Sequence, residues 1–208
     1  MITEVLPINH QIAISHAADI IKHNGLIAFP TDTVYGIGAL ATSEETIERL
    51  FIVKGRKRSQ AVALLISAPS EMTRIATDIP ENAWKLAEEF WPGPLTIVLK
   101  RNPALPKIIS PLPTVGIRVP NHPFVLALLR ETGPLAVTSA NRSGEPSAIN
   151  ARQVLDQLSG KIHLLIDGGT ATGRIPSTVI DCTTDPITVL RDGPISHKEL
   201  MKAIRKTP

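Results

Sequence analysis

Cysteine, aromatic residues and long apolar runs are all scarce in this sequence. Its single cysteine, Cys182, excludes a framework of internal disulfides and a zinc site built from several thiolates. Aromatic residues make up 3% of the chain, too few for an oligonucleotide-binding surface that depends on base stacking. No stretch reaches 18 consecutive apolar residues, and residues 1–11 contain no basic segment leading into an apolar core. We therefore expect no membrane association and a cytoplasmic location.

The signatures of several enzyme classes are also missing. The sequence has no P-loop, no serine-hydrolase elbow and no histidine pair at metal-ligand spacing, and its six histidines are scattered. Cys182 ends an apolar run with no basic partner beside it, so buried packing is a better interpretation than nucleophilic catalysis. We expect neither a covalent protein nucleophile nor a metal site made by the protein itself.

The residues that are present are typical of a globular domain. A chain of 208 residues can bury a sizeable core, and we expect residues 1–208 to form one domain. Hydrophobic residues make up 43% and charged residues 20%, a balance that argues against disorder. The net charge of +3 is explained more simply by ordinary lysine usage than by a dedicated nucleic-acid surface.

Helical and strand-like patterns alternate along most of the chain. Helical spacing and capping residues predict helices over residues 11–24, 43–54, 83–90, 151–158, from Asn121 to Leu129, and from Ser196 onward. Apolar runs predict strands over residues 26–29, 62–66, 95–99, 115–119, 135–137, 162–166, 178–182 and 187–191, the last two forming a hairpin. This order predicts an α/β fold with a mixed sheet flanked by helices. Residues 101–113, with four prolines, are either a mobile lid or a plain surface loop.

The most informative stretch covers residues 26–58. A short apolar strand leads into a turn, residues 30–38, that is rich in threonine and glycine, and four of the five residues 54–58 are cationic. A polyphosphate requires backbone N–H groups, hydroxyls and fixed cations, because its charge is spread over many oxygens. We interpret the stretch as a site for an anionic ligand. A solvated helix end that complements the helix dipole is the alternative for the cations.

Residues 36–41 match the dinucleotide-binding fingerprint G-x-G-x-x-G/A. In that fingerprint the glycines turn directly from strand to helix, whereas here residues 30–35 intervene and the next helix starts only near Ser43. No acidic residue lies about 20 positions further on to meet a ribose. We therefore do not interpret the match as an NAD site.

Two further polar turns lie at strand ends, at residues 138–141 and 176–178. Arg118 alternates with valine and isoleucine in the strand 115–119, so its side chain points out of the core. Open α/β sheets place their sites at strand ends. Three such turns and one outward-facing arginine together predict a site for nucleotide chemistry.

Eight segments, in this order, are similar to the motifs of a known family: residues 30–38, 54–56, 91–96, 116–120, 122–123, 138–141, 176–181 and 190–191. They include a lysine-x-arginine element and a serine-x-asparagine element. The sequence resembles the YrdC-like family of threonylcarbamoyl-AMP synthases over about residues 10–200.

The resemblance implies a twisted mixed sheet flanked by helices around a deep, positively charged cleft. It implies that L-threonine, bicarbonate or CO₂, and ATP form threonylcarbamoyl-AMP and pyrophosphate, the first step towards N6-threonylcarbamoyladenosine at position 37 of tRNA. tRNA and downstream threonylcarbamoyl-transferase proteins are then expected partners. The residues that it implies for threonine are Thr31, Arg118, Thr138 and Ser177. Those that it implies for ATP are Lys54, Arg56, Thr114, Ser139, Asn141, Ser147 and Arg191.

The chemistry of these residue types agrees with that reaction. The amine of threonine captures CO₂ as a carbamate, whose oxygen attacks the α-phosphate; since both partners are anionic, catalysis is mainly charge neutralisation and positioning. No protein nucleophile is needed. Mg²⁺ helps to neutralise pyrophosphate, but few carboxylates lie near these motifs, Asp32 being the exception, so we expect the metal to come with ATP and expect no organic cofactor.

The sequence departs from the family pattern after the lysine-x-arginine element. Residues 57–62 replace a proline and a later proline-leucine pair and add two cations, which predicts a looser loop. The alternative is therefore a non-enzymatic relative that binds RNA in the same cationic cleft. A carbamoyl-transfer module of hydrogenase maturation is a weaker third option, because those proteins carry cysteine-rich zinc modules. Longer family members have a C-terminal extension, which we do not expect in a sequence that ends at Pro208.

Overall fold

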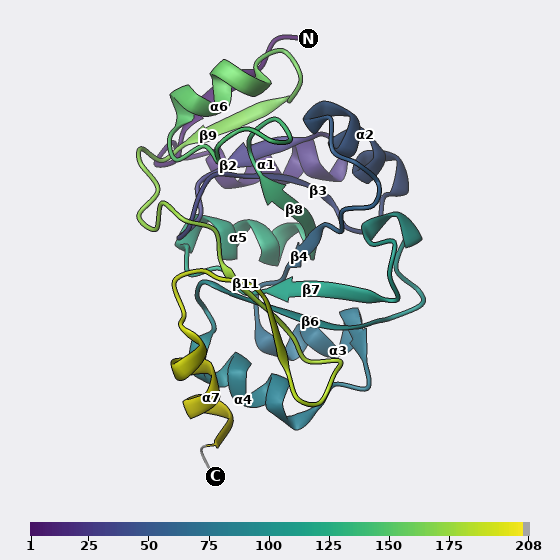
Figure 1. Ribbon diagram of the computed structural model, residues 1–208. Coiled ribbons are helices and arrows are strands. Elements are labelled where there is room, and N and C mark those ends of the chain that lie inside the picture. The colour runs from purple at the N-terminus through teal and green to yellow at the C-terminus, as the bar shows by residue number, and fades with distance from the viewer. Residues whose placement is uncertain (206–208) are drawn as a thin grey trace.

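A mixed β-sheet forms the centre of residues 1–205, the part of the chain that the computed structural model describes (Figure 1). Its strands are β1 (Glu4–Pro7), β2 (Ile27–Phe29), β3 (Gly36–Leu40), β4 (Ala63–Leu65), β5 (Ala76–Thr77), β6 (Leu95–Arg101), β7 (Thr114–Arg118), β8 (Leu135–Ser139), β9 (Leu164–Asp167), β10 (Thr178–Asp181) and β11 (Thr188–Arg191). They follow the order β1-β9-β2-β3-β8-β4-β7-β6-β10-β11, and β5 pairs with β6. Parallel pairs such as β4–β7 and β6–β10 stand beside antiparallel pairs such as β3–β8 and β10–β11, which confirms the predicted mixed sheet and the late hairpin.

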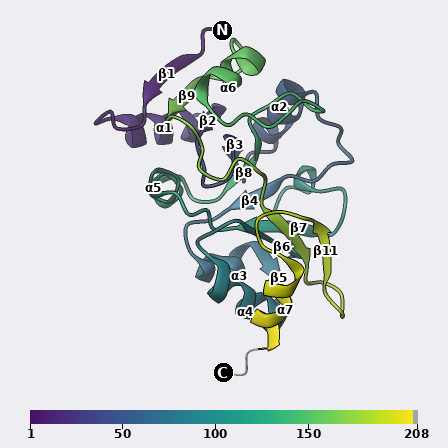
Figure 2. The same cartoon turned by 60° about the vertical axis from the view of Figure 1, so that its left-hand side comes forward.

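Helices cover this sheet: α1 (Ala13–Lys22), α2 (Glu44–Lys54), α3 (Met72–Ile75), α4 (Glu81–Phe90), α5 (Pro123–Thr132), α6 (Ala151–Leu158) and α7 (His197–Arg205). Helices α1 and α5 lie side by side, while α4 and α7 lie together near the C-terminal end (Figures 1 and 2). Within residues 1–205, no helix has the length and apolar character needed to cross a bilayer.

Two cores of buried side chains lie on opposite faces of the sheet. Ile27 and Ala28 are neighbours in β2, yet they belong to different cores, because successive strand residues point to opposite faces. The smaller core joins Ile27 to α1 and α5 through Ile21 and Leu128. The larger core contains Ala28 and the apolar side of α2, including Leu50. Both faces of β2 are therefore buried, as its continuous apolar sequence predicts.

Capping side chains fix three helix starts where the sequence predicts them. Ser43 Oγ accepts a hydrogen bond from the backbone of the first turn of α2, and Asn150 Oδ1 does the same for α6. At α7, Glu199 Oε2 accepts from the Ser196 N–H at 2.8 Å, and the Glu199 N–H donates to Ser196 Oγ, which is a capping box. These helices begin where local polar groups satisfy the free N–H groups of the first turn.

Helix α5 starts differently from the prediction. The helix begins at Pro123 and its N-cap position is His122, whose side chain makes no capping bond, so the prediction that Asn121 caps it is wrong. Proline at the first helical position already has a helical φ and has no N–H to satisfy, which reduces the need for a side-chain cap. Leu129 is buried as predicted, whereas Leu126 is only partly buried.

The glycine-rich segment is a strand, where the sequence predicts a turn. Gly36 and Gly38 belong to β3, and a Cβ placed on Gly38 would lie 2.9 Å from Cε1 of Phe29. Glycine is needed here because the aromatic ring packs directly against the β3 backbone. No helix follows β3 directly, since α2 begins at Glu44, so the rejection of the dinucleotide fingerprint is correct.

The proline-rich segment after β6 is attached to the body of the protein. Lys107–Ile109 form a short 3₁₀ helix, and Ile109 is fully buried. The carbonyl oxygen of Ile109 accepts a hydrogen bond of 2.8 Å from the N–H of Val62, just before β4. This anchor favours the surface-loop interpretation of residues 101–113 over the lid.

Candidate active site

A cavity of about 380 Å³ is walled by the turn after β2 and by strands β4, β6, β7, β8 and β10. This volume lies in the usual range of small-molecule sites. Eight of the eleven residues predicted for threonine or ATP line it: Thr31, Arg56, Arg118, Thr138, Ser139, Ser147, Ser177 and Arg191. Segments that are far apart in the sequence therefore share one cavity. The role of each residue towards threonine or ATP stays a prediction.

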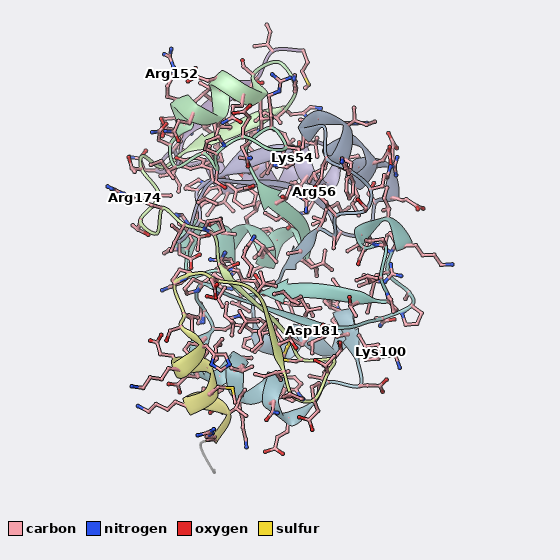
Figure 3. All side chains as sticks on the ribbon, viewed as in Figure 1. Lys54, Arg56, Lys100, Arg152, Arg174 and Asp181 are labelled. Carbon is pink, nitrogen blue, oxygen red and sulfur yellow. The ribbon has the colours of Figure 1, made fainter. Side chains whose placement is uncertain are left out.

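Lys54, Thr114 and Asn141 are the predicted site residues that do not line the cavity. Thr114 lies at the start of β7 and is partly buried, one full strand length away from Arg118. Lys54 and Asn141 bond to each other, and Lys54 also bonds to the backbone of Ser139, which does line the cavity. Figure 3 shows Lys54 and Arg56 near the centre of the molecule, in contrast to exposed cations at its edge.

Lys54 supports the turn that follows β8. Its side chain is 3% exposed, and its Nζ donates to the carbonyl oxygens of Ser139 and Asn141 and to Asn141 Oδ1. The Asn141 amide in turn donates to the carbonyl oxygens of Arg142 and Glu145. Burial, and secondarily the charge of Arg56, lower the pKa of Lys54 to about 7. The lysine thus holds the backbone of Ser139 in place from behind.

Arg118 is buried with a single acidic partner. Its Nη2 pairs with Asp32 Oδ1 at 2.6 Å, its Nη1 donates to Thr33 Oγ1 at 3.0 Å, and its Nε donates to the carbonyl of Gly93 at 2.9 Å. Burial lowers the pKa of Arg118, and Asp32 opposes this shift. Of the five guanidinium N–H groups, two remain for a ligand. The sequence predicts that Arg118 points out of the core. In the structure its side chain lines the cavity, and the residue is only 7% exposed.

The hydroxyl of Thr31 is fully used inside the protein. It donates to the carbonyl of Val34 at 2.7 Å and accepts from the N–H of Thr33 at 3.1 Å. Because its one proton is committed, it must also accept from the Thr33 hydroxyl, 3.0 Å away, which fills its second lone pair. A ligand can therefore meet Thr31 through its methyl group, or by displacing one of these bonds.

Arg56 and Arg191 add positive charge to the same cavity. Arg56 donates to the carbonyls of Gln60 and Ala61, and Arg191 donates to the carbonyl and hydroxyl oxygens of Ser177. Burial lowers the pKa of both arginines; the charge of Arg191 adds to the effect on Arg56, and that of Arg118 to the effect on Arg191. Within the described chain, no lining residue of the cavity is acidic. An anion that enters would relieve this repulsion.

Besides Thr33, which bonds to Arg118, the sequence interpretation missed two polar residues of the cavity wall, Tyr35 and Thr96. The Tyr35 hydroxyl donates to the carbonyl of Gly169 at 2.7 Å and accepts from the N–H of Gly168 at 3.1 Å, and burial raises its pKa. Thr96 Oγ1 lies 2.8 Å from Ser177 Oγ. The signal was available, because both residues lie inside matched segments and Thr96 alternates with the core residues Leu95 and Ile97 of β6.

The two cations that the altered loop adds, Lys57 and Arg58, are not part of the cavity lining. Arg58 forms an ion pair with Glu48 of α2, and its guanidinium lies 5.9 Å from the centre of the Phe51 ring. Neither Lys57 nor Arg58 lines the cavity. Arg56 therefore remains the arginine of this loop that faces the site.

The described residues do not form a metal centre of their own. In residues 1–205 no three His, Cys, Asp or Glu side chains cluster as metal ligands. Asp32, the carboxylate that the sequence analysis considers as a metal ligand, is already paired with Arg118.

Comparison with known proteins identifies the family. The Sua5/YciO/YrdC family model, described as "Telomere recombination", matches residues 19–193. The chain belongs to this family. Its fold agrees with the crystal structure of E. coli YciO, with a TM-score of 0.84 and 27% identity over 96% of this chain and 98% of that one.

Two matches from Pyrococcus abyssi are more similar in sequence. The curated threonylcarbamoyl-AMP synthase is 42% identical over 190 residues, which cover 90% of this chain and 56% of that protein. The crystal structure of Sua5 complexed with L-threonine is 39% identical, with a TM-score of 0.92 over 98% of this chain and 60% of that one. The chain thus spans little more than half the length of these family members.

Proposed function

We propose that this protein forms threonylcarbamoyl-AMP and pyrophosphate from L-threonine, bicarbonate or CO₂, and ATP. The cavity carries the proposal: Arg56, Arg118 and Arg191 meet hydroxyl side chains there, and no lining residue of the described chain is acidic. Such a lining suits two anionic reactants that must be held side by side. The relatives named threonylcarbamoyl-AMP synthase support the proposed product, and the complex of P. abyssi Sua5 with L-threonine supports threonine as a substrate.

In the proposed reaction, the α-amine of threonine takes up CO₂ as a carbamate and loses a proton. A carbamate oxygen then attacks the α-phosphorus of ATP, the bond to the bridging oxygen breaks, and pyrophosphate leaves with the electron pair. The side chains contribute charge neutralisation and alignment rather than a covalent intermediate. We assign threonine to Thr31, Arg118, Thr138 and Ser177. We assign ATP to Arg56, Ser139, Ser147 and Arg191, with support from Lys54, Thr114 and Asn141.

The metal belongs to the substrate in this proposal. Mg²⁺ arrives bound to the phosphates of ATP and supplies positive charge to the leaving pyrophosphate. Asp32 stays with Arg118 and is not assigned as a metal ligand. The proposal further places the reaction in the cytoplasm, with tRNA and a threonylcarbamoyl-transferase protein as the consumers of the product.

The experiment that tests this function measures pyrophosphate. Purified protein given L-threonine, bicarbonate and Mg·ATP should release pyrophosphate, and omission of any one of them should stop the release. Threonylcarbamoyl-AMP should appear in equal amount when the products are separated rapidly. A protein that makes no pyrophosphate with any amino acid, yet binds structured RNA with a steep salt dependence, would instead support the RNA-binding alternative.

ATP binding should take up protons at about pH 8 through Lys54. With a pKa of about 7, roughly nine in ten Lys54 side chains are neutral at that pH in the free protein. A polyphosphate beside Arg56 favours the ammonium form and raises this pKa, so ATP affinity should weaken as pH rises from about 7 to 9. Calorimetry in two buffers of different ionisation enthalpy measures the uptake.

The control for this prediction is Lys54→Arg, whose side chain stays charged over the whole range. The ionisation of ATP itself contributes equally in both proteins, so the difference between them isolates Lys54. Equal proton uptake by the two proteins would show that Lys54 is not coupled to the phosphates.

A further inference from the structure

The hydroxyl of Ser177 lies in a short chain of hydrogen bonds on the cavity wall. Ser177 comes just before β10 and Thr96 lies on the neighbouring strand β6; they are 4% and 5% exposed, and both line the cavity. Thr96 Oγ1 is 2.8 Å from Ser177 Oγ, and Arg191 Nη2 donates to the same Ser177 oxygen from 3.1 Å. Ser177 thus contacts two protein groups and the cavity at once.

The two hydroxyls can share their hydrogen bond in either direction. Each hydroxyl has one proton and two lone pairs, and Arg191 already occupies one lone pair of Ser177. Either direction leaves one hydroxyl proton without an acceptor among the described residues: the proton of Thr96 if Ser177 donates, and that of Ser177 if Thr96 donates. If Thr96 donates to Ser177, both lone pairs of Ser177 are filled and its own proton points into the cavity. This arrangement satisfies both buried hydroxyls within the protein except for the one donor that a ligand can use.

We propose that Thr96 is a positioning residue that fixes the Ser177 hydroxyl as a donor towards the carboxylate of the amino-acid substrate. This inference rests on the proposed function, because that function places threonine beside Ser177. A hydroxyl with both lone pairs filled can only donate, so Ser177 donates to a carboxylate oxygen and mismatches a donor group at that position. The donated bond is oriented before the substrate arrives, which lowers the ordering cost of binding.

Thr96→Val tests the inference, because it keeps the side-chain shape and removes the hydroxyl. The Kd for L-threonine, measured by calorimetry, should rise about three- to tenfold, since Ser177 loses its fixed direction but keeps its proton. Thr96→Ser should bind threonine within about twofold of the wild type. Ser177→Ala should weaken binding at least as much as Thr96→Val. The double variant should be no weaker than Ser177→Ala alone, because Thr96 acts through Ser177.

Thr178→Val is the matched control, since it is the same substitution made at the residue that follows Ser177 in the chain. The Thr178 hydroxyl is fully buried, bonds to the backbone of Ile195 in both directions and does not line the cavity. We expect this variant to have a lower Tm and an unchanged Kd for threonine. If Thr96 served only the fold, a similar loss of Tm in Thr178→Val would raise the Kd for threonine as much as Thr96→Val does.

Two outcomes overturn the inference alone. The first is that the wild type binds threonine and the Thr96→Val variant binds it equally tightly. The other is additivity in the double variant, which would show that Thr96 meets the ligand independently of Ser177. A wild type that binds no threonine overturns the proposed function itself, and the role of Thr96 with it.

Discussion

Arg56→Ala should lower kcat/KM for ATP by about 100-fold, which is the size of effect expected when one preorganised donor to a developing charge is removed. Arg56 lines the cavity, and it donates hydrogen bonds to the carbonyls of Gln60 and Ala61 in its own loop. Losing these two bonds should destabilise the fold by only about 1 kcal/mol. The loss of activity would therefore come from the site rather than from unfolding. Steady-state pyrophosphate release and urea unfolding of the same preparation separate the two effects.

Arg58→Ala is the matched control for Arg56→Ala. Arg58 lies two residues further along the same loop, has the same charge, and pairs with Glu48 instead of lining the cavity. It should retain activity within about twofold, because the pair is at the surface. Similar losses in both variants would mean that the net charge of the loop, and not the position of Arg56, supports the reaction.

Arg118→Gln should have two large effects at once. It should weaken threonine binding, and it should lower the free energy of unfolding. The substitution leaves the Asp32 carboxylate, 12% exposed, without its cationic partner, which typically destabilises a fold by roughly 3 to 5 kcal/mol. It also removes the two remaining N–H groups that can face a carboxylate, so the threonine Kd should rise about 10- to 100-fold. Urea unfolding measures the first effect and calorimetry with L-threonine the second.

The double variant Arg118→Gln with Asp32→Asn separates these effects. Neutralising Asp32 removes the unpaired buried charge, so most of the lost stability should return. Threonine binding should stay weak, because no guanidinium is restored. If the double variant binds threonine like the wild type, Arg118 serves only to neutralise Asp32 and is not part of the threonine site.

Local signals were sufficient for much of the fold. Ser43, Asn150 and the Ser196–Glu199 pair predicted three helix starts, because a cap is a contact between residues close in sequence. The β10–β11 hairpin was predicted for the same reason. Strand β3 was missed, since its glycines suggested a turn and the reason for them, Phe29 packing across the backbone, is a contact between strands.

The candidate site divides in the same way. Residues of the matched motifs were predicted to act together, and eight of them do face one cavity. Which of them offers a free group to a ligand was not readable from the motif. The Thr31 hydroxyl has no free donor or acceptor, and the Lys54 amine donates to a backbone carbonyl, because neighbouring groups already occupy both side chains.

By itself, the sequence determined the alternation of strands and helices, the helix caps and the set of hydroxyls and cations that a polyphosphate site requires. Only the tertiary structure decided how those groups are used. Asp32 forms an ion pair with Arg118, Lys54 donates to the carbonyl of Ser139, and the hydroxyls of Thr96 and Ser177 are hydrogen-bonded to each other. The physical reason is that periodicity and capping depend on neighbours in the chain, whereas the direction of a buried hydrogen bond depends on every donor and acceptor around it.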